Sequence, residues 1–425
     1  MRLYSTLQRD LVELPPPPGP VRMYFCGPTV YQRAHIGNAR PFIVGMWLRN
    51  WLRLRGYDVT LVHNITDVND KIYDAAPGKS AELAARATDW YLRDTADLGL
   101  GIPDQLPKAT EHIPAIISFI ERLVAGGHAY AVEGDVYFRV SSDPEYGRLS
   151  RQRVDQMEEE EHNALKEAPQ DFALWKASKP GEDTSWESPW GAGRPGWHIE
   201  CSVMAEEAFG PVFEVHGGGL DLVFPHHENE LAQSRALGHD FARLWTHNGM
   251  LEFSGEKMSK SLGNDVSLRN VLDTWGREVV LLFFLTAHWR KPIEFTDETL
   301  AQARSQVDTF RNFFVDARAS EPTEQERLAE VLEDDFNTPG ALALLHEWRP
   351  RGRAGDVRAG LELFGLASLA KREAPPPEVV EVAAARQAAR AAGDFAEADR
   401  LREKIAGLGW EVRDAPSGSE LVRKT

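Results

Sequence analysis

The chain has 425 residues, and this length predicts roughly two to four domains. Its net charge of −17, from 48 Lys and Arg against 65 Asp and Glu, excludes a protein that coats nucleic acid non-specifically, because a phosphate polymer would be repelled on average. The longest apolar run, about Val279 to Leu285, is too short to span a membrane, and the N-terminus lacks the apolar core of a secretory signal. We therefore expect a cytoplasmic protein with no membrane partner.

The first elements predict a βαβ unit. A strand, a glycine-containing turn, an amphipathic helix and a second strand follow one another at Val21 to Cys26, His35 to Asn38, Pro41 to Arg55 and Asp58 to Asn64. Parallel strands joined in this way place a ligand at their carboxyl ends, beside the N-terminus of the helix. His35 falls at this position.

The next part of the chain predicts an insertion into the sheet. Within residues 113–195 we expect a helix at Ile116 to Gly126, a strand at Asp135 to Val140 and a solvated acidic loop at Glu158 to Glu161. The sheet then resumes with Val212 to His216 and three glycines, and Trp245 to Glu252 leads into a lysine-containing loop. The parallel sheet is thus predicted to be split in two.

The C-terminal third is predicted to be helical from Thr299, with a linker at Pro375 to Pro377 and a last helix containing Asp394 to Asp399. The predicted fold class is α/β, a split Rossmann-like parallel-sheet domain with an inserted α+β subdomain, followed by a helical bundle and a small C-terminal α/β unit. The expected boundaries are 1–112 and 196–250 for the two halves, 113–195 for the insertion, 251–298 for the region with the lysine loop, 299–374 for the bundle and 378–425 for the last unit.

Two short segments predict a site for a nucleoside triphosphate. The turn His35-Ile36-Gly37-Asn38 opens a helix and offers backbone and side-chain donors to phosphate, and Lys257-Met258-Ser259-Lys260-Ser261 carries two lysines that neutralise a departing pyrophosphate. Either segment alone is an ordinary turn or a solvated loop. Together they resemble the signatures of class I aminoacyl-tRNA synthetases, which implies that His35, Asn38, Lys257 and Lys260 are catalytic and that Gly37 also contacts ATP. Many members of that class have histidine where this chain has Asn38.

The two cysteines, Cys26 and Cys201, are too few for a disulfide scaffold. Zinc prefers four ligands drawn from thiolate, imidazole and carboxylate, and His226 and Glu230 stand four residues apart at the predicted start of a helix, so both can reach one ion. The alternative makes both cysteines buried small apolar residues and the His/Glu cluster a solvated helix start. The residues alone leave both interpretations open.

Four further segments extend the resemblance over essentially the full length of the chain. They are Phe25-Cys26-Gly27-Pro28-Thr29-Val30-Tyr31, Asn64-Ile65-Thr66-Asp67, Trp197-His198-Ile199-Glu200-Cys201 and His216-Gly217-Gly218-Gly219 through Glu230. They are similar to the cysteinyl-tRNA synthetase family, which implies ligation of L-cysteine to tRNA(Cys) through a cysteinyl-adenylate, with ATP and Mg²⁺ as the substrate complex. The resemblance also implies one zinc ion held by Cys26, Cys201, His226 and Glu230, which takes the thiolate of cysteine in preference to the serine hydroxyl. We expect a monomer.

Several further residues are expected to form the substrate pocket. Trp197 shares a face with Cys201 and is expected to form a wall of the amino-acid pocket, and the lack of side chains on Gly217, Gly218 and Gly219 lets the backbone approach adenosine. His216 precedes these glycines and is expected in the same pocket. We expect Thr66 to contact the substrate carboxylate, and Asp221 the ammonium group or the ribose; each of the three is alternatively part of the scaffold.

The last unit contains 8 basic and 9 acidic residues from Glu378 to Thr425, so it is no basic patch in bulk. Gly407 to Asp414 resembles the anticodon-reading end of the family, which implies that Trp410 stacks on an unpaired base and that Arg413 or Asp414 reads a base edge. Four arginines are a second candidate contact for tRNA phosphates or, alternatively, a solvated surface: Arg349, Arg351, Arg353 and Arg358.

Two other functions fit parts of the sequence. A cysteine ligase of mycothiol biosynthesis, which joins cysteine to an amino sugar, would share the catalytic half but has no use for an anticodon unit. A catalytically silent zinc protein that binds RNA has no use for His35, Lys257 and Lys260. The segment from Asp394 onward and the phosphate-handling residues favour tRNA charging over both.

Overall fold

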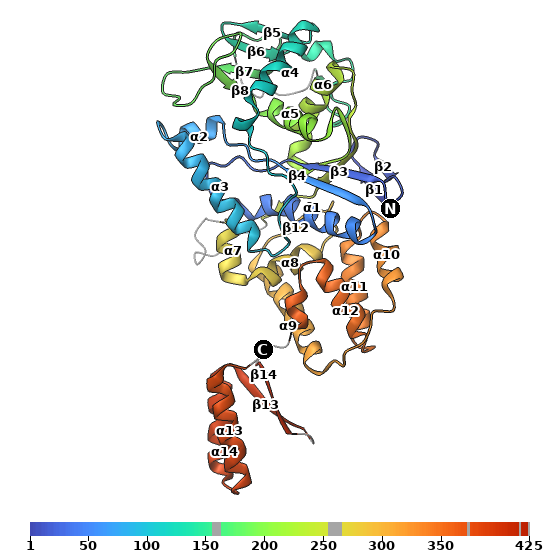
Figure 1. The fold of residues 1–425 in the computed structure, drawn as a ribbon, viewed down its shortest axis with the longest axis vertical. Coiled ribbons are helices and arrows are strands. Elements are labelled where there is room, and N and C mark those ends of the chain that lie inside the picture. Colours follow the sequence, from blue (N-terminus) through green and yellow to red (C-terminus); the bar gives the residue numbers. More distant parts are fainter. Residues whose placement is uncertain (155–162, 254–265, 372–374, 416–417, 424–425) are drawn as a thin grey trace.

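The computed structural model describes residues 1–154, 163–253, 266–371, 375–415 and 418–423. Its centre is a parallel sheet with the strand order β10-β9-β3-β4 (Figure 1). The strands are β3 (Pro20–Phe25), β4 (Asp58–His63), β9 (Val212–Gly219) and β10 (Phe241–Asn248). Most of their residues are buried on both faces, as is typical of a parallel sheet covered by helices.

The order of the strands changes direction between β3 and β9. The chain passes from β3 through α1 (Ile36–Leu54) to its neighbour β4, but it later enters β9 on the other side of β3 and continues through α6 (Glu228–Ala236) to β10. At such a point a crevice forms outside the carboxyl ends of the strands. Cys26 directly follows β3 and Gly219 ends β9, so both lie at this crevice.

The connection between the two halves carries an antiparallel sheet with the order β5-β6-β7-β8. Its strands are Ala129–Val132, Asp135–Phe138, Phe172–Ala177 and Gly193–Pro195, and the helices of this part are α2 (Asp70–Ala75), α3 (Ser80–Ala96), α4 (Ile113–Ala125) and α5 (Trp197–Phe209). Helix α5 joins the two sheets. Its Ile199 and Val203 pack in the core of the insertion, whereas Cys201 and Met204 pack against the central sheet.

A helical region covers the opposite side of α1 (Figure 1). Its helices are α7 (Leu268–Trp275), α8 (Arg277–Leu285), α9 (Asp297–Asp316), α10 (Gln325–Glu333), α11 (Thr338–Trp348) and α12 (Ala354–Leu363). Two short strand pairs accompany it, namely β1 (Arg2–Ser5) with β2 (Asp10–Glu13) and β11 (Leu251–Glu252) with β12 (Ile293–Glu294). These helices share one apolar core with α1.

The C-terminal unit stands apart from the body in Figure 1 and has a small core of its own. It consists of α13 (Pro377–Ala391), α14 (Phe395–Gly407) and the antiparallel strands β13 (Trp410–Ala415) and β14 (Gly418–Arg423). None of the helices in the described ranges is long and apolar enough to cross a membrane.

The predicted split α/β fold is confirmed, with local corrections at the ends of several elements; for example, α4 is Ile113–Ala125 and β6 ends at Phe138. Helix α1 begins at Ile36 rather than Pro41, because the His35 side chain caps it. Strand β9 continues through Gly219 instead of ending at His216, and α13 begins at Pro377, inside the predicted linker. The acidic run at 158–161 lies outside the described residues.

Candidate functional site

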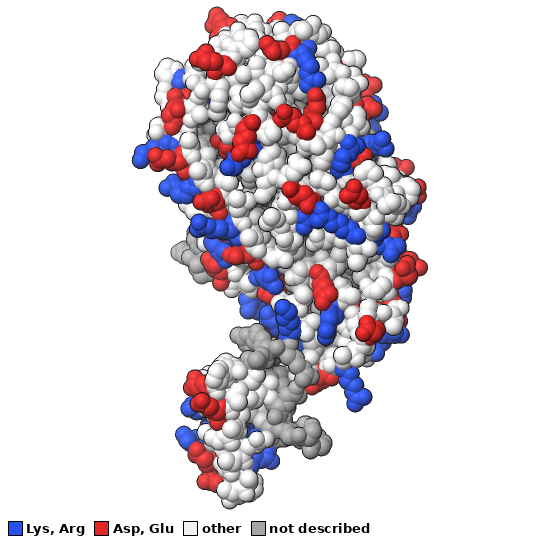
Figure 2. All heavy atoms as spheres, in the orientation of Figure 1, with Lys and Arg blue, Asp and Glu red and all other residues white. Residues whose placement is uncertain are grey.

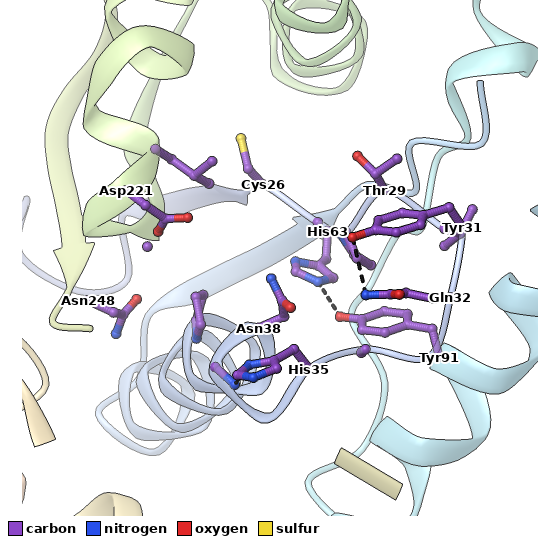
Figure 3. A pocket seen from close by; sticks show the side chains of 18 of the residues that line it. Cys26, Thr29, Tyr31, Gln32, His35, Asn38, His63, Tyr91, Asp221 and Asn248 are labelled. Atoms are coloured by element: carbon purple, nitrogen blue, oxygen red, sulfur yellow. Dashed lines mark hydrogen bonds between the residues drawn. The ribbon is translucent and has the colours of Figure 1, made fainter. Parts of the chain in front are cut away.

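A cavity of about 360 Å³ opens at the crevice between β3 and β9. The loop after β3, the start of α1 and the ends of β9 and β10 contribute to its walls, together with Trp197 of α5. Figure 3 shows Cys26 at one end of this cavity and His35 at the start of α1, with Asp221 and Asn248 along one side. This volume lies in the range of small-molecule and cofactor sites.

The start of α1 presents side-chain donors to the cavity. His35 is the N-cap, and its Nδ1 accepts a hydrogen bond from the Gly37 backbone N–H at 3.1 Å. In the neutral ring the proton therefore sits on Nε2, which makes Nε2 a donor. The N–H groups of Ile36 and Asn38 donate to the carbonyls of Val266 and His35, both at 2.9 Å. The expected backbone donation to phosphate is thus wrong for these three amides in this conformation, and the side chains of His35 and Asn38 line the cavity.

His63 and Tyr91 also line the cavity, and sequence reasoning missed both. His63 Nδ1 donates to the Phe25 carbonyl at 2.9 Å, and its Nε2 accepts a hydrogen bond from the Tyr91 hydroxyl (Figure 3). Burial lowers the pKa of His63 to about 4, so the ring is neutral. His63 stands at the carboxyl end of a predicted strand, and this position indicates that its side chain lies near the ligand crevice. No sequence pattern marks Tyr91 as a residue of the cavity.

Four buried side chains from distant parts of the chain meet beside the cavity. One ligand atom from each of Cys26, Cys201, His226 and Glu230 lies within 4.8 Å of the other three. The Cys26 Sγ to Glu230 Oε1 distance is 3.7 Å, and the His226 Nε2 to Glu230 Oε1 distance is 3.4 Å. Tetrahedral zinc with its usual bond lengths separates such atoms by about 3.4 to 3.6 Å. The donor set and its spacing fit a zinc ion.

The electrostatics of this group also suit a cation. Burial, followed by the neighbouring Cys201, raises the pKa of the Cys26 thiol well above its usual value, and burial raises the pKa of Cys201 as well. Burial alone would raise the pKa of Glu230, but His216 and His226 outweigh it and lower that pKa. A bound cation would displace the thiol protons and hold all three groups in their charged forms.

Further side chains hold the ligand atoms in place. His216 Nε2 lies 2.6 Å from Glu230 Oε2, His198 Nδ1 lies 3.0 Å from His226 Nδ1, and the Trp197 ring stacks on His226 at 4.2 Å between centroids. Such contacts orient metal ligands and fix their tautomers. His216 is fully buried and does not line the cavity, so the structure corrects its expected contact with substrate.

A second set of possible ligands overlaps the first. Cys26, His216, His227 and Glu230 also have ligand atoms within 4.8 Å of one another. The first set is the better one, because Glu230 Oε1 faces both Cys26 and His226, whereas His216 already bonds to Glu230 Oε2.

The other expected pocket residues divide into two groups. Trp197, Gly219 and Asp221 line the cavity, whereas Thr66, Gly217 and Gly218 do not. Thr66 is buried. A Cβ on Gly217 would lie 2.5 Å from the Phe25 ring, and one on Gly218 would lie 2.9 Å from the Leu222 side chain. These two glycines therefore admit protein side chains, which corrects their expected approach to adenosine.

Lys257 and Lys260 lie outside the described residues. The residues that flank their segment are anchored at the cavity, because Met250 and Leu251 line it and Ser267 forms a backbone bridge with His35.

The structure corrects one of the tRNA contacts expected from the sequence, that of Trp410. Trp410 is only 5% exposed and packs in the small C-terminal core, so the expected stacking on a base is wrong for this conformation. Arg413 and Asp414 lie in β13, opposite Glu420 and Ser419, and their side chains lie outside what is described.

Acidic partners neutralise part of the arginine cluster. Arg351 pairs with Glu347 at 2.8 Å, and Arg353 pairs with Glu324 at 2.9 Å. Figure 2 shows acidic and basic side chains interspersed over the face of the molecule that it displays. These two arginines are therefore poorer phosphate contacts than the sequence suggests.

Comparisons with known proteins agree with this geometry. Residues 15–305 match the family model of the tRNA synthetases class I (C) catalytic domain, and residues 374–420 match that of the cysteinyl-tRNA ligase anticodon binding domain. Among solved structures, Mycobacterium tuberculosis methionyl-tRNA synthetase bound by methionyl-adenylate is similar in fold, with a TM-score of 0.55, 15% identity and coverage of 82% of this chain and 88% of that one. A leucyl-tRNA synthetase from Agrobacterium radiobacter gives a TM-score of 0.57 at 12% identity, with 83% and 84% covered.

Curated relatives match over almost the whole chain. The cysteine–tRNA ligase of Halorhodospira halophila is 43% identical and covers 96% of this chain and 95% of its own length. That of Pseudothermotoga lettingae is 42% identical, with coverage of 99% and 98%. By these matches the chain belongs to the cysteinyl-tRNA synthetase family.

Proposed function

We propose that this protein joins L-cysteine to tRNA(Cys) in two steps, through a cysteinyl-adenylate, with release of pyrophosphate and AMP. The observation that carries the proposal is the buried group of Cys26, Cys201, His226 and Glu230 at one end of a nucleotide-sized cavity. Membership of the family supports the same reaction. We further propose that the protein acts as a monomer in the cytoplasm.

Selection of cysteine is assigned to the metal end of the cavity. A zinc ion held by the four residues would supply a centre that takes a thiolate sulfur as a ligand much more readily than a serine hydroxyl. Trp197 covers His226 and faces the cavity, so it shapes the space for a small side chain. Discrimination by size alone separates near-isosteres by only about 10- to 200-fold, which makes such a centre useful for decoding.

Formation of the adenylate is assigned to α1 and the lysine segment. The carboxylate of cysteine attacks the α-phosphorus of ATP, and pyrophosphate leaves with its Mg²⁺. His35 donates from Nε2 and Asn38 from its amide to phosphate oxygens, while Lys257 and Lys260 neutralise the departing pyrophosphate. The Asn38 side-chain amide does not ionise, so its role is to orient the phosphate by a hydrogen bond and not to act as an acid.

Transfer to tRNA is the second step, in which the terminal ribose hydroxyl takes the acyl group from the adenylate. The unit at 378–425 is assigned to the anticodon, supported by its match to the anticodon binding domain. Its separation from the body in Figure 1 suits a long RNA that reaches both the cavity and this unit.

Three assays on the purified protein test the proposal. We expect about one zinc per chain, pyrophosphate exchange into ATP that depends on cysteine, and charging of tRNA(Cys) with cysteine but not serine. Exchange without charging of any tRNA would favour the amino-sugar ligase. RNA binding without exchange would favour the silent zinc protein, and either result would overturn the proposal.

A further inference from the structure

One buried arginine of α1 makes no ion pair with a carboxylate of the described residues. The side chain of Arg40 is only 1% exposed, and burial lowers the pKa of its guanidinium to about 10. A fully buried arginine is normally paired with an acidic group, because an uncompensated charge inside a protein destabilises the fold. The contacts that Arg40 makes instead are all with backbone carbonyls.

The guanidinium of Arg40 joins three separate parts of the chain. Its Nη1 donates to the carbonyl of Gly249 at 2.5 Å and to that of Met250 at 3.3 Å, and its Nη2 donates to the carbonyl of His288 at 3.1 Å. Gly249 and Met250 directly follow β10, and His288 lies between α8 and β12. The side chain therefore ties α1 to the end of the central sheet and to the helical region.

Two of the segments that Arg40 joins are walls of the cavity. His35 and Asn38, which shortly precede Arg40 in the chain, line it at the start of α1, and Gly249 and Met250 line it after β10. Arg40 itself does not line the cavity. It therefore holds the α1 donors and the adjoining wall together from behind, without a surface that a ligand could touch.

The wall and the segment around His288 are also bonded to each other. The backbone N–H of Gly249 donates to the Trp289 carbonyl at 2.9 Å, and that of Ile293 donates to the Met250 carbonyl at 3.1 Å. These backbone bonds do not involve Arg40. What Arg40 adds is a hydrogen-bonded attachment of the paired segments to α1, so its loss should move the wall relative to α1 and leave the segments themselves folded.

We propose that Arg40 is a positioning residue for adenylate formation, which fixes the wall at Gly249 and Met250 relative to His35 and Asn38 so that the reacting phosphate is held in line. The inference rests on the proposed function, since it needs ATP in the cavity. Arg40 touches no substrate and moves no proton. A misplacement of about 1 Å costs a reaction about 100-fold in rate, so the effect falls mainly on kcat.

Pyrophosphate exchange by Arg40→Met and Arg40→Lys tests the inference. Arg40→Met removes every donor, whereas Arg40→Lys keeps the charge and loses the planar fork that reaches two segments at once. Both variants are expected to lower kcat by about 10- to 100-fold and to change the KM for ATP by less than about threefold. The KM for cysteine should stay within about twofold, because Arg40 has no contact with the four proposed zinc ligands.

Arg49→Met is the matched control. Arg49 is a second buried arginine of α1, and it donates to the carbonyl of Ile102, which does not line the cavity. Circular dichroism gives the folded fraction of each variant, to which its rate is scaled, so a purely structural loss leaves the scaled kcat unchanged. Arg49→Met should keep the scaled kcat within about twofold of the wild type.

Each other outcome overturns the inference. A wild-type scaled kcat in Arg40→Met, an equal fall in Arg49→Met, or full activity in Arg40→Lys would show that the fork of Arg40 does not position the wall. Failure of both Arg40 variants to fold, while Arg49→Met folds, would make Arg40 a residue of the fold alone. All of these results leave exchange by the wild type intact, whereas its absence would reject the proposed function and the inference with it.

Discussion

The two ends of the cavity are built differently. At the metal end other side chains of the protein hold two of the four proposed ligands, since His216 bonds to Glu230 and both His198 and Trp197 contact His226. At the nucleotide end the side-chain Nδ2 of Asn248 has no hydrogen-bond partner among the described residues, and Asn38 lines the same cavity.

This difference indicates that the amino acid is selected at the metal end and that the nucleotide is recognised at the other end. The metal site recognises a single substrate atom, the sulfur, by its preference as a ligand. This recognition requires neighbouring side chains that keep the metal ligands in place. A cavity wall that leaves a donor such as Asn248 Nδ2 without a partner among the described residues leaves that hydrogen bond to a larger ligand. Substitutions at the metal end should therefore alter metal content, whereas those at the nucleotide end should alter kinetics alone.

Lys260→Ala gives the largest expected effect and tests the nucleotide end. Removing a charge that stabilises the leaving pyrophosphate should slow exchange by about 10²- to 10³-fold, while binding of cysteine survives. The measurement is pyrophosphate exchange together with equilibrium binding of cysteine. Lys79→Ala, an exposed lysine before α3, is the matched control, and an unchanged exchange rate in Lys260→Ala would contradict the assignment.

Chelation of the metal tests the other end. Removal of zinc should abolish the preference for cysteine over serine in exchange before the protein unfolds, because the selecting centre is lost while the cores remain. Zinc content, exchange with each amino acid and circular dichroism are followed together during dialysis. Cys201→Ser should reproduce the loss of zinc. Intact discrimination in metal-free protein would show that selection lies elsewhere.

His216→Ala sharpens the comparison by removing a support and leaving all four proposed ligands. The structure predicts a fall of about 10- to 100-fold in zinc affinity, because Glu230 loses the partner that orients it. Competition with a coloured chelator measures this affinity. His239→Ala, a histidine in the loop before β10, is the matched control. An unaltered zinc affinity in His216→Ala, together with a raised KM for cysteine, would restore the direct contact expected from the sequence.

A carboxylate far from both ends should affect stability alone. Asp356 accepts hydrogen bonds from the backbone N–H groups of Thr323 and Glu324, both at 2.7 Å, at the start of α10. Burial would raise the pKa of Asp356, but these bonds and that from Gln325 outweigh it and lower the pKa. Asp356→Asn should reduce the free energy of unfolding by about 1–3 kcal/mol at pH 7, with exchange activity retained.

The pH dependence of this effect follows from the direction of the shift. A carboxyl group whose pKa is lowered in the folded state stabilises the fold at pH values above its unfolded pKa of about 3.9. This stabilisation is lost as the pH falls through the folded pKa. The difference between wild type and Asp356→Asn should therefore be full at neutral pH and shrink below about pH 4. Denaturant unfolding at several pH values measures it, and a difference that grows on acidification would contradict the assignment.

The sequence predicted some features well because their signals are local. The spacing of His226 and Glu230 permitted a shared ion, the family resemblance implied the full ligand set, and the structure brings Cys26 and Cys201 to the same cluster. His216 was misplaced because three glycines after a strand look like a loop, whereas β9 continues through them and keeps His216 inside. Trp410 was misplaced because nothing near it shows that α13 and α14 need it as a core residue.

Other features depend on contacts that no sequence pattern reveals. The start of α1 depends on a histidine that bonds to the backbone of Gly37, and histidine is not among the usual N-cap residues. The sequence also does not show whether the side chain of Asn248 has a hydrogen-bond partner, because that depends on which side chains the fold places around it.

The central claim is that Cys26, Cys201, His226 and Glu230 hold one zinc ion that recognises sulfur. Zinc X-ray absorption spectroscopy on the protein with and without cysteine tests this most directly. The account predicts two sulfur ligands at about 2.3 Å without cysteine and three with it. A sulfur count that stays the same when cysteine binds, or a zinc site without sulfur, would contradict it.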